Sequence, residues 1–166
     1  TSITDLRREI KNLKAKIFAK LSSRSPKDAS QFLEKQIIPI IKKNMKKVPK
    51  NDLNMRMWAL RQSFLQASQI STSSELLELF SYSNRVVSDL RIFLNSFPDE
   101  EHWPNIYIVI REFSNDLDVA CEYRAFIKDG KMTALSQYQQ ELCMPQIVQN
   151  HEKISQLIQD FFYIKF

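Results

Sequence analysis

The chain has 166 residues, of which 43% are hydrophobic and 26% are charged, and its formal net charge is +5. This composition is typical of a soluble globular domain and excludes a disordered tail. No apolar stretch approaches the roughly 20 residues that a membrane span needs. The small positive charge is compatible with an anionic ligand without requiring one.

Glycine and cysteine usage narrow the class further. Gly130 is the single glycine, where average usage of about 7% predicts about a dozen. We therefore expect a fragment, or a chain from which loops are missing. Cys121 and Cys143 have no metal-binding spacing, which favours reduced thiols in a cytoplasmic protein.

The first predicted elements are a helix and a strand. Leu6, Ile10 and Leu13 follow a helical rhythm. Residues 17–21 then alternate, which predicts a strand with the odd-numbered residues on one face and Lys20 on the other.

A second helix is expected over residues 25–47. Ser25 fits the N-cap, Pro26 the first helical position and Asp28 the first turn. Pro39 should kink or divide this helix. A loop over residues 48–54 should follow.

Five lysines gather around the end of this helix. Their helical spacing distributes the charge around the helix, as in a solvated segment, and no aromatic residue is interleaved with them. A nucleic-acid interface is therefore the less favoured interpretation. The lysines are Lys42, Lys43, Lys46, Lys47 and Lys50.

The middle of the chain combines an ambiguous segment, a clear helical region and a strand. Residues 53–68 are compatible with a helix or with a strand that leads into one. In residues 72–97, Thr72 and Glu75 form a capping box before an apolar stripe. The β-branched run over residues 105–113 predicts a strand buried on both faces.

A hairpin and a last helix complete the predicted elements. The pair Asp129-Gly130 predicts a two-residue turn, so that Lys128 faces Lys131. In the same register Arg124 faces Leu135 and Glu122 faces Gln137. A final helix is expected over residues 146–161. The mixture of elements without a strict repeat indicates an α+β fold.

The faces of this hairpin leave two interpretations open. One predicted face carries Glu122, Arg124, Phe126, Lys128, Thr133, Leu135 and Gln137, while the other carries Tyr123, Ala125, Ile127, Met132, Ala134 and Ser136. Neither face is plainly apolar. The charged face therefore either contacts a ligand or is a solvated edge ribbon.

Two motifs in this order resemble the cell division cycle protein 123 family. "REF" followed by "CEYRAFIKDGKMTALSQY" is similar to a strand ending in Arg-Glu/Lys-aromatic, a Glu-aromatic-Arg-x-Phe-Val strand, a tight turn and an Ile-Ser-Gln strand. "FAKLSSRSPKDA" is similar to the family's Lys-Leu-x-x-Ser-x-Pro-x-Asp-Ala segment. The resemblance spans about residues 10–138, or about 10–162 at its widest.

This resemblance implies an ATP-grasp-like fold, with mixed helices and a small antiparallel sheet, that binds ATP and magnesium between two lobes. Residues 1–166 would form a single ATP-grasp-like region, with the first lobe at about 1–60 and the second at about 61–166. Lys20 and Arg124 would contact the phosphates, with Glu122 beside Arg124. Ile110, Arg111 and Glu112 would offer backbone groups to the adenine.

The chain departs from the family pattern at the expected metal site. Family members carry an Asp-x-Asn strand that supplies the magnesium ligands, and only Asp160 follows Gln159 here. We therefore name no metal ligand from the sequence, and expect a divergent member or a piece of one.

The resemblance also implies a function. It implies a cytoplasmic assembly factor for translation initiation factor 2, which would bind a protein partner such as a subunit of that factor. Two alternatives stay open: an ATP-grasp enzyme that activates a carboxylate or transfers phosphoryl groups, and a protein-interaction domain with a degenerate nucleotide site. Whether the chain is an enzyme is left undecided.

Overall fold

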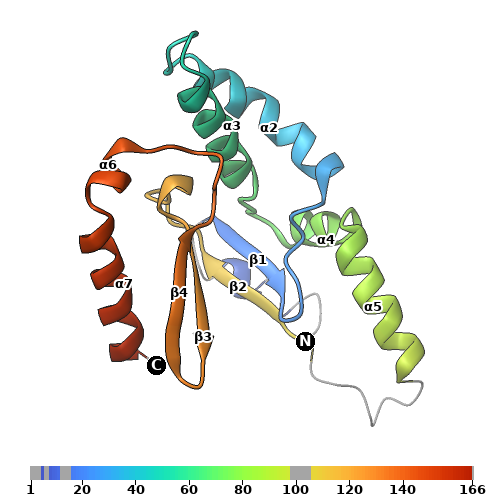
Figure 1. Ribbon diagram of the computed structural model, residues 1–166. Coiled ribbons are helices and arrows are strands. Elements are labelled where there is room, and N and C mark those ends of the chain that lie inside the picture. Colours follow the sequence, from blue (N-terminus) through green and yellow to red (C-terminus); the bar gives the residue numbers. More distant parts are fainter. Residues whose placement is uncertain (1–4, 6–7, 12–15, 98–105, 166) are drawn as a thin grey trace. The chain divides into compact units, whose positions relative to one another are not determined.

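The computed structural model describes the chain except for residues 1–4, 6–7, 12–15, 98–105 and 166 (Figure 1). It contains helices and two small antiparallel sheets, which confirms the α+β prediction. None of the described helices is long and apolar enough to cross a membrane. In chain order the elements are β1 (Ile17–Leu21), α2 (Ser30–Met45), α3 (Leu53–Ala67), α4 (Ser73–Ser81), α5 (Asn84–Ser96), β2 (Ile108–Glu112), η2 (Val119–Cys121), β3 (Tyr123–Lys128), β4 (Lys131–Gln137), α6 (Pro145–Gln149) and α7 (His151–Lys165).

The chain divides into two compact units, which are described separately. The first unit consists of residues 1–43 and 63–115, and the second of residues 44–62 and 116–166. The helices α2 and α3 each begin in one unit and end in the other. The two nucleotide-binding lobes expected from the resemblance, with their boundary near residue 60, stay a prediction.

The first unit contains the β1–β2 sheet. The two strands are antiparallel, with Ile17 opposite Glu112 and Leu21 opposite Ile108. The predicted alternation in β1 is confirmed, because its odd-numbered residues are all buried. The prediction that residues 105–113 are buried on both faces is wrong: among the described strands β2 pairs with β1 alone, and none of its residues is fully buried. Asn105 lies outside the described residues.

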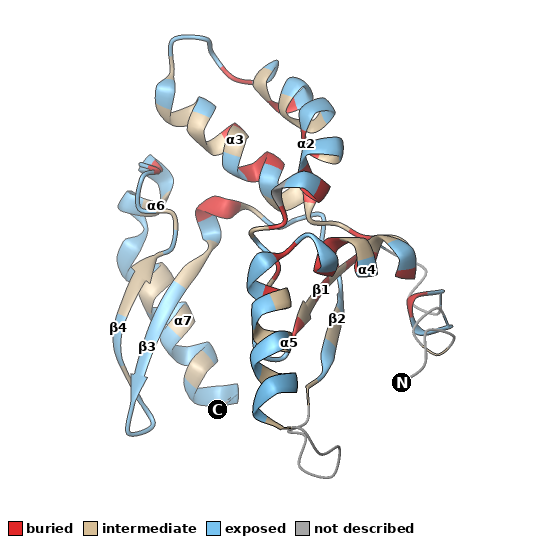
Figure 2. Ribbon diagram, turned by 90° about the vertical axis from the view of Figure 1, so that its right-hand side faces the viewer, coloured by how far each residue is buried: buried red, intermediate tan, exposed pale blue. Residues whose placement is uncertain are grey.

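A continuous apolar core covers the inner face of β1. Leu76, Leu79 and Phe80 of α4 are spaced to lie on one helix face and are buried against it. Figure 2 shows buried residues on β1 and on the helices of this unit. The core comprises Ile10, Ile17, Ala19, Leu21, Ala29, Phe32, Leu33, Ile37, Ala67, Ile70, Leu76, Leu79, Phe80 and Val86.

The predicted capping box begins α4. The Glu75 amide donates to the Thr72 hydroxyl (3.1 Å), and the Thr72 amide donates to the Glu75 carboxylate (3.2 Å). The single helical region expected over residues 72–97 is divided, however. Ser83 is the N-cap of α5, and its hydroxyl accepts from the Val86 amide. A second cap inside an apolar stripe therefore starts a second helix.

The expected start of α2 is wrong. The helix begins at Ser30, and Lys27 and Asp28 form a turn before it. The reason lies in Asp28, whose carboxylate accepts from the Ser83 hydroxyl (2.6 Å) and from the Arg85 amide (3.0 Å). This carboxylate therefore binds the start of α5 and not the start of its own helix. Pro39 lies inside α2 without dividing it.

Of the remaining helical predictions, one is confirmed, one is divided and one lies partly outside the described residues. Residues 53–68 are helical, as α3. The helix predicted over residues 146–161 is two helices, with Asn150 between α6 and α7. At the N-terminus residues 8–11 are helical, whereas Leu6 and Leu13 lie outside the described residues.

The second unit is built on the β3–β4 hairpin, which lies along α7 (Figure 1). Asp129 and Gly130 both have positive φ angles, 51° and 72°, as a two-residue hairpin turn requires. Lys128 faces Lys131 as predicted. Nearly all of β3 is exposed.

Candidate functional site

The outer face of the β1–β2 sheet carries two cations beside two apolar residues. Opposite residues of an antiparallel pair lie on the same face, so Phe18 with Arg111 and Lys20 with Val109 form this face. Lys20 and Arg111 are diagonal neighbours, a spacing of roughly 7–8 Å in such ribbons. In the described part of the chain neither side chain forms an ion pair. Both charges therefore remain available to an anion.

One edge of β2 has no strand beside it among the described residues. The Ser22 amide donates to the Tyr107 carbonyl and the Phe113 amide donates to the Lys16 carbonyl, both at 2.8 Å. Backbone groups alternate in direction along a strand. The odd-numbered residues of this segment therefore bond to β1, and Ile110 and Glu112 direct their amide and carbonyl groups to the open edge.

The segment that follows β1 is fixed at several points. The Tyr107 amide donates to the Ser22 hydroxyl (3.2 Å), and Arg24 forms an ion pair with Asp89 (2.9 Å). Burial raises the pKa of Asp28, but the hydrogen bonds from Ser83 and Arg85 outweigh it, so the pKa of this carboxyl lies below its ordinary value. These contacts hold the end of the strand that carries Lys20.

The hairpin places Glu122 and Arg124 on one face, as predicted, but the opposite strand is shifted by one residue. Arg124 faces Ser136 and not Leu135, and Tyr123 takes the place expected for Glu122 opposite Gln137. The cause is a bulge at Thr133, which lies between the pairs formed by Phe126 and Ile127. One extra residue moves every later side chain of β4 to the other face.

This shift gives Arg124 an aromatic neighbour. The Tyr138 amide donates to the Glu122 carbonyl (2.7 Å), which continues the pairing beyond β4. The guanidinium carbon of Arg124 lies 4.8 Å from the centre of the Tyr138 ring, a cation–π distance. Arg124 is exposed and forms no ion pair with another described residue. Its fork of donors can therefore bind an anion.

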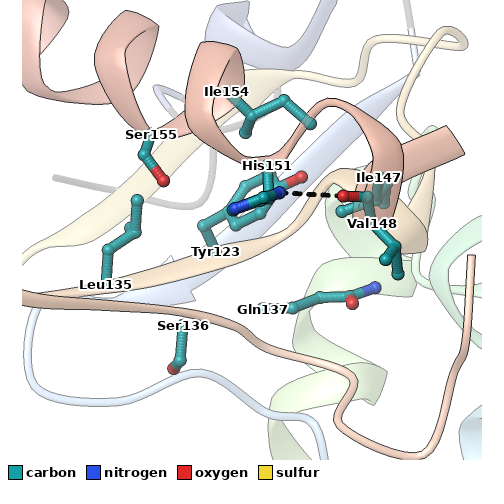
Figure 3. A pocket seen from close by; sticks show the side chains of 9 residues that line it. All are labelled: Tyr123, Leu135, Ser136, Gln137, Ile147, Val148, His151, Ile154 and Ser155. Atoms are coloured by element: carbon teal, nitrogen blue, oxygen red, sulfur yellow. Dashed lines mark hydrogen bonds between the residues drawn. The ribbon is translucent and has the colours of Figure 1, made fainter.

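Residues of the β3–β4 hairpin, α6 and α7 line a pocket of about 530 Å³ (Figure 3). The Nδ1 atom of His151 donates to the Val148 carbonyl (2.9 Å), which leaves Nε2 directed elsewhere. Burial, followed by the proximity of Cys121, raises the pKa of Tyr123, so its hydroxyl stays protonated at neutral pH. None of the predicted site residues lines this pocket. Its walls are Tyr123, Leu135, Ser136, Gln137, Ile147, Val148, His151, Ile154 and Ser155.

The structure thus groups the sequence-predicted residues by unit. Lys20 and Arg111 share a face, and Ile110 and Glu112 share an edge, in the first unit. Glu122 and Arg124 share a face in the second unit. Two residues were missed: Phe18, whose place followed from the alternation, and Tyr138, whose place depends on the bulge.

No magnesium ligand can be assigned from these groups. Across the residues that the structure describes, no three His, Cys, Asp or Glu side chains gather as metal ligands. The magnesium ion implied by the resemblance therefore stays an expectation, and no chemical step is derived from it.

Comparison with known proteins identifies the family. A family model described as D123, the cell division cycle protein 123 family, matches residues 34–166. The matched range includes Ile110, Arg111, Glu112, Glu122 and Arg124, and begins after Lys20. A search of curated proteins finds no match. Because the model covers most of the chain, the protein belongs to the D123 family.

Proposed function

We propose that the chain is an ATP-binding module with an ATP-grasp-like fold. Following the family resemblance, Lys20 and Arg124 would each contact phosphates, with Glu122 beside Arg124. Arg111 adds a second cation on the face that carries Lys20. The open edge of β2 would accept the adenine. Adenine carries a donor and an acceptor side by side on one edge, which matches the Ile110 carbonyl and the Glu112 amide.

The observation that carries this proposal is the combination found on β2. Within the described ranges, β2 has no strand along one edge, and Arg111, on its outer face beside Lys20, forms no ion pair. Hydrogen bonds to charged groups contribute about 1.5–3 kcal/mol each. Phe18 and Val109 on the same face supply an apolar surface next to the cations. A nucleotide would match these features, because its phosphates are anionic, its base is apolar on both faces, and the edge of the adenine carries a donor and an acceptor.

Calorimetric titration of ATP tests the proposal. Lys20→Ala should weaken ATP binding roughly ten- to hundredfold, the equivalent of one charge-assisted hydrogen bond. The matched control is Lys46→Ala, since Lys46 is exposed and makes no described contact. Equal losses from both variants would indicate diffuse attraction to a basic surface, and no binding to the unsubstituted protein would refute the site. Repeating the titration without magnesium decides whether the ion contributes.

We further propose, from family membership, that this ATP-binding module acts in the cytoplasm as an assembly factor for translation initiation factor 2. Binding to purified subunits of that factor, measured by titration with and without ATP, tests the partner. Binding that is unchanged by Lys20→Ala would separate the partner surface from the nucleotide site. Failure of every subunit to bind would remove the assembly role and leave the nucleotide site standing.

A further inference from the structure

Side chains of helix α3 form hydrogen bonds to the chain segment that leads into the hairpin. The Gln62 carboxamide donates to the Leu117 carbonyl (2.7 Å) and accepts from the Val119 amide (3.0 Å). Gln62 is only 7% exposed, and Val119 is 3% exposed. This side chain bonds to the backbone with one donor and one acceptor, as a neighbouring strand would. The bond from Val119 is buried and the bond to Leu117 is partly buried, so both are difficult to replace by water.

A second side chain of α3 binds the same segment. The indole N–H of Trp58 donates to the Asp118 carboxylate (2.8 Å). The same oxygen accepts from the Ala120 amide (2.8 Å) and so caps the short helix η2. Gln137, at the end of β4, donates to the Ala120 carbonyl (3.2 Å). The start of the hairpin is thus tied to α3 and to its own last strand.

The chain that leaves the hairpin is held by the same helix. The Asn54 carboxamide donates to the Cys143 carbonyl (2.6 Å) and accepts from the Cys143 amide (2.8 Å). Arg61 forms an ion pair with Glu141. The hydrogen bonds of the Glu141 carboxylate, first to its own backbone and then to Arg61, lower its pKa.

These contacts lie on one face of α3. Asn54, Trp58, Arg61 and Gln62 are spaced by four, three and one residues, and this spacing puts them on the same side of a helix. We name them the α3 clamp. Gln62 bonds to the backbone before β3, and Asn54 bonds in the same way to the backbone after β4. In the hairpin itself, nearly all of β3 is exposed.

We propose that Asn54, Trp58 and Gln62 are positioning residues, which fix both ends of the hairpin and thereby hold Arg124 in place for the phosphates of a nucleotide. This inference rests on the proposed ATP binding. Arg124 is the second residue of β3 and lies close to the clamped segment. A change in the direction of the hairpin would move its guanidinium group away from the ligand. A guanidinium group that is already held in place loses less entropy on binding. A hairpin that is less well held should therefore bind the nucleotide more weakly.

The substitution Gln62→Glu tests this role on the full chain. Glutamate keeps the length of the side chain and can accept from Val119, but it cannot donate to the Leu117 carbonyl. We expect ATP affinity to fall by about fivefold or more, and the backbone amides of residues 123–137 to exchange hydrogen faster. Gln159→Glu is the matched control, since Gln159 is exposed on α7. It should leave both measurements unchanged.

A double-mutant cycle separates positioning from general destabilisation. If Gln62 acts through Arg124, the loss of affinity caused by Gln62→Glu should fall to less than about twofold in an Arg124→Met background. Equal losses in both backgrounds would overturn the proposal. If Gln62→Glu does not fold, Trp58→Phe removes the indole donor, keeps a smaller aromatic ring and should give the same pattern.

ATP binding and the positioning role of the α3 clamp can be refuted separately. If the unsubstituted chain binds no ATP, the proposed function is wrong, and hydrogen exchange alone decides whether the clamp orders the hairpin. If ATP binds but neither Gln62→Glu nor Trp58→Phe changes exchange in residues 123–137, the clamp does not position the hairpin. If exchange changes and ATP affinity does not, Arg124 needs no such positioning.

Discussion

The two antiparallel ribbons of this protein are stabilised in different ways. In the β1–β2 ribbon, Ile17, Ala19 and Leu21 are buried against a large apolar core. In the β3–β4 hairpin nearly every residue of β3 is exposed, and polar contacts from α3 hold both ends. An apolar core resists local opening, whereas a ribbon with few apolar contacts opens more readily.

This difference has a consequence for ligand binding. The core-backed ribbon can present backbone groups and cations at a fixed place, with little adjustment. The direction of the hairpin depends on the polar contacts of the α3 clamp, so the position of a group such as Arg124 depends on them as well. The predictions below compare the two ribbons, from the largest expected effect to the smallest.

The largest difference should appear in stability. Ile17→Ala removes a fully buried side chain of β1 and should lower the free energy of unfolding by about 2–5 kcal/mol. Ile127→Ala makes the same change on β3, where the side chain is 48% exposed, and should lower it by less than about 1 kcal/mol. Urea unfolding of both variants measures this. Equal losses would mean that the hairpin also depends on apolar burial.

Arg124→Met should reduce ligand binding without a similar loss of stability. Methionine keeps much of the apolar stem but removes the donor fork, so ATP affinity should fall roughly ten- to hundredfold. Thermal stabilisation by ATP should largely disappear, while the melting temperature without ATP should move by a few degrees at most. Arg91→Met, at an exposed position of α5, is the control.

Two other results would change this interpretation of the hairpin. If ATP stabilises Arg124→Met as well as the unsubstituted protein, the charged face is a solvated ribbon. If the melting temperature without ATP falls strongly, Arg124 is part of an ion pair with Glu122 and the stranded carboxylate is destabilising.

Asp28→Asn should weaken the first unit in a pH-dependent manner. The substitution removes a charged acceptor from Ser83 and Arg85 and should lower the free energy of unfolding by about 1–2 kcal/mol at neutral pH. The pKa of Asp28 is lower in the folded chain than its ordinary value of 3.8. Its contribution is therefore complete above that value and is lost as the pH falls through the folded pKa.

Unfolding experiments at several pH values measure this difference. The gap between Asp28→Asn and the unsubstituted protein should narrow as the solution becomes more acidic than about pH 4. Asp160→Asn, at an exposed site on α7, should show no such gap. A gap that stays constant down to low pH would mean that the charge of Asp28 is not what matters.

The smallest expected effect concerns Tyr138. An exposed cation–π contact contributes about 0.5–1 kcal/mol, so Tyr138→Leu should lower ATP affinity about two- to fivefold through a less ordered Arg124. Tyr163→Leu, on an exposed side of α7, should have no effect. An unchanged affinity in Tyr138→Leu would show that the ring does not help to order the guanidinium group.

The sequence predicted the features that depend on near neighbours. The alternation in β1, the Thr72–Glu75 capping box and the Asp129-Gly130 turn are all encoded within a few residues, and the structure contains each of them. The motifs of the resemblance also lie within short segments, and the family model confirms the family.

Features that depend on distant partners were not predicted. The Asp28 carboxylate accepts a hydrogen bond from Ser83, which lies 55 residues later in the chain. No local signal distinguishes this contact from the capping of its own helix. The face of α3 that contacts the segments before and after the hairpin carries the polar groups of Asn54, Trp58 and Gln62 and no apolar stripe. The sequence of residues 53–68 therefore did not distinguish a helix from a strand that leads into one. The bulge at Thr133 leaves no mark in the turn sequence, and the partner of Arg124 was therefore misassigned.

The bulge makes the hairpin sensitive to chain length at one point. Deletion of a single residue at Thr133 would restore the register set by the turn, so that Leu135 and Gln137 would join Arg124 on its face and Tyr138 would leave it. A substitution at the same position keeps the residue count and therefore keeps both faces. When related hairpins are aligned, a one-residue gap in this strand therefore exchanges one surface for another, even where every other amino acid is identical.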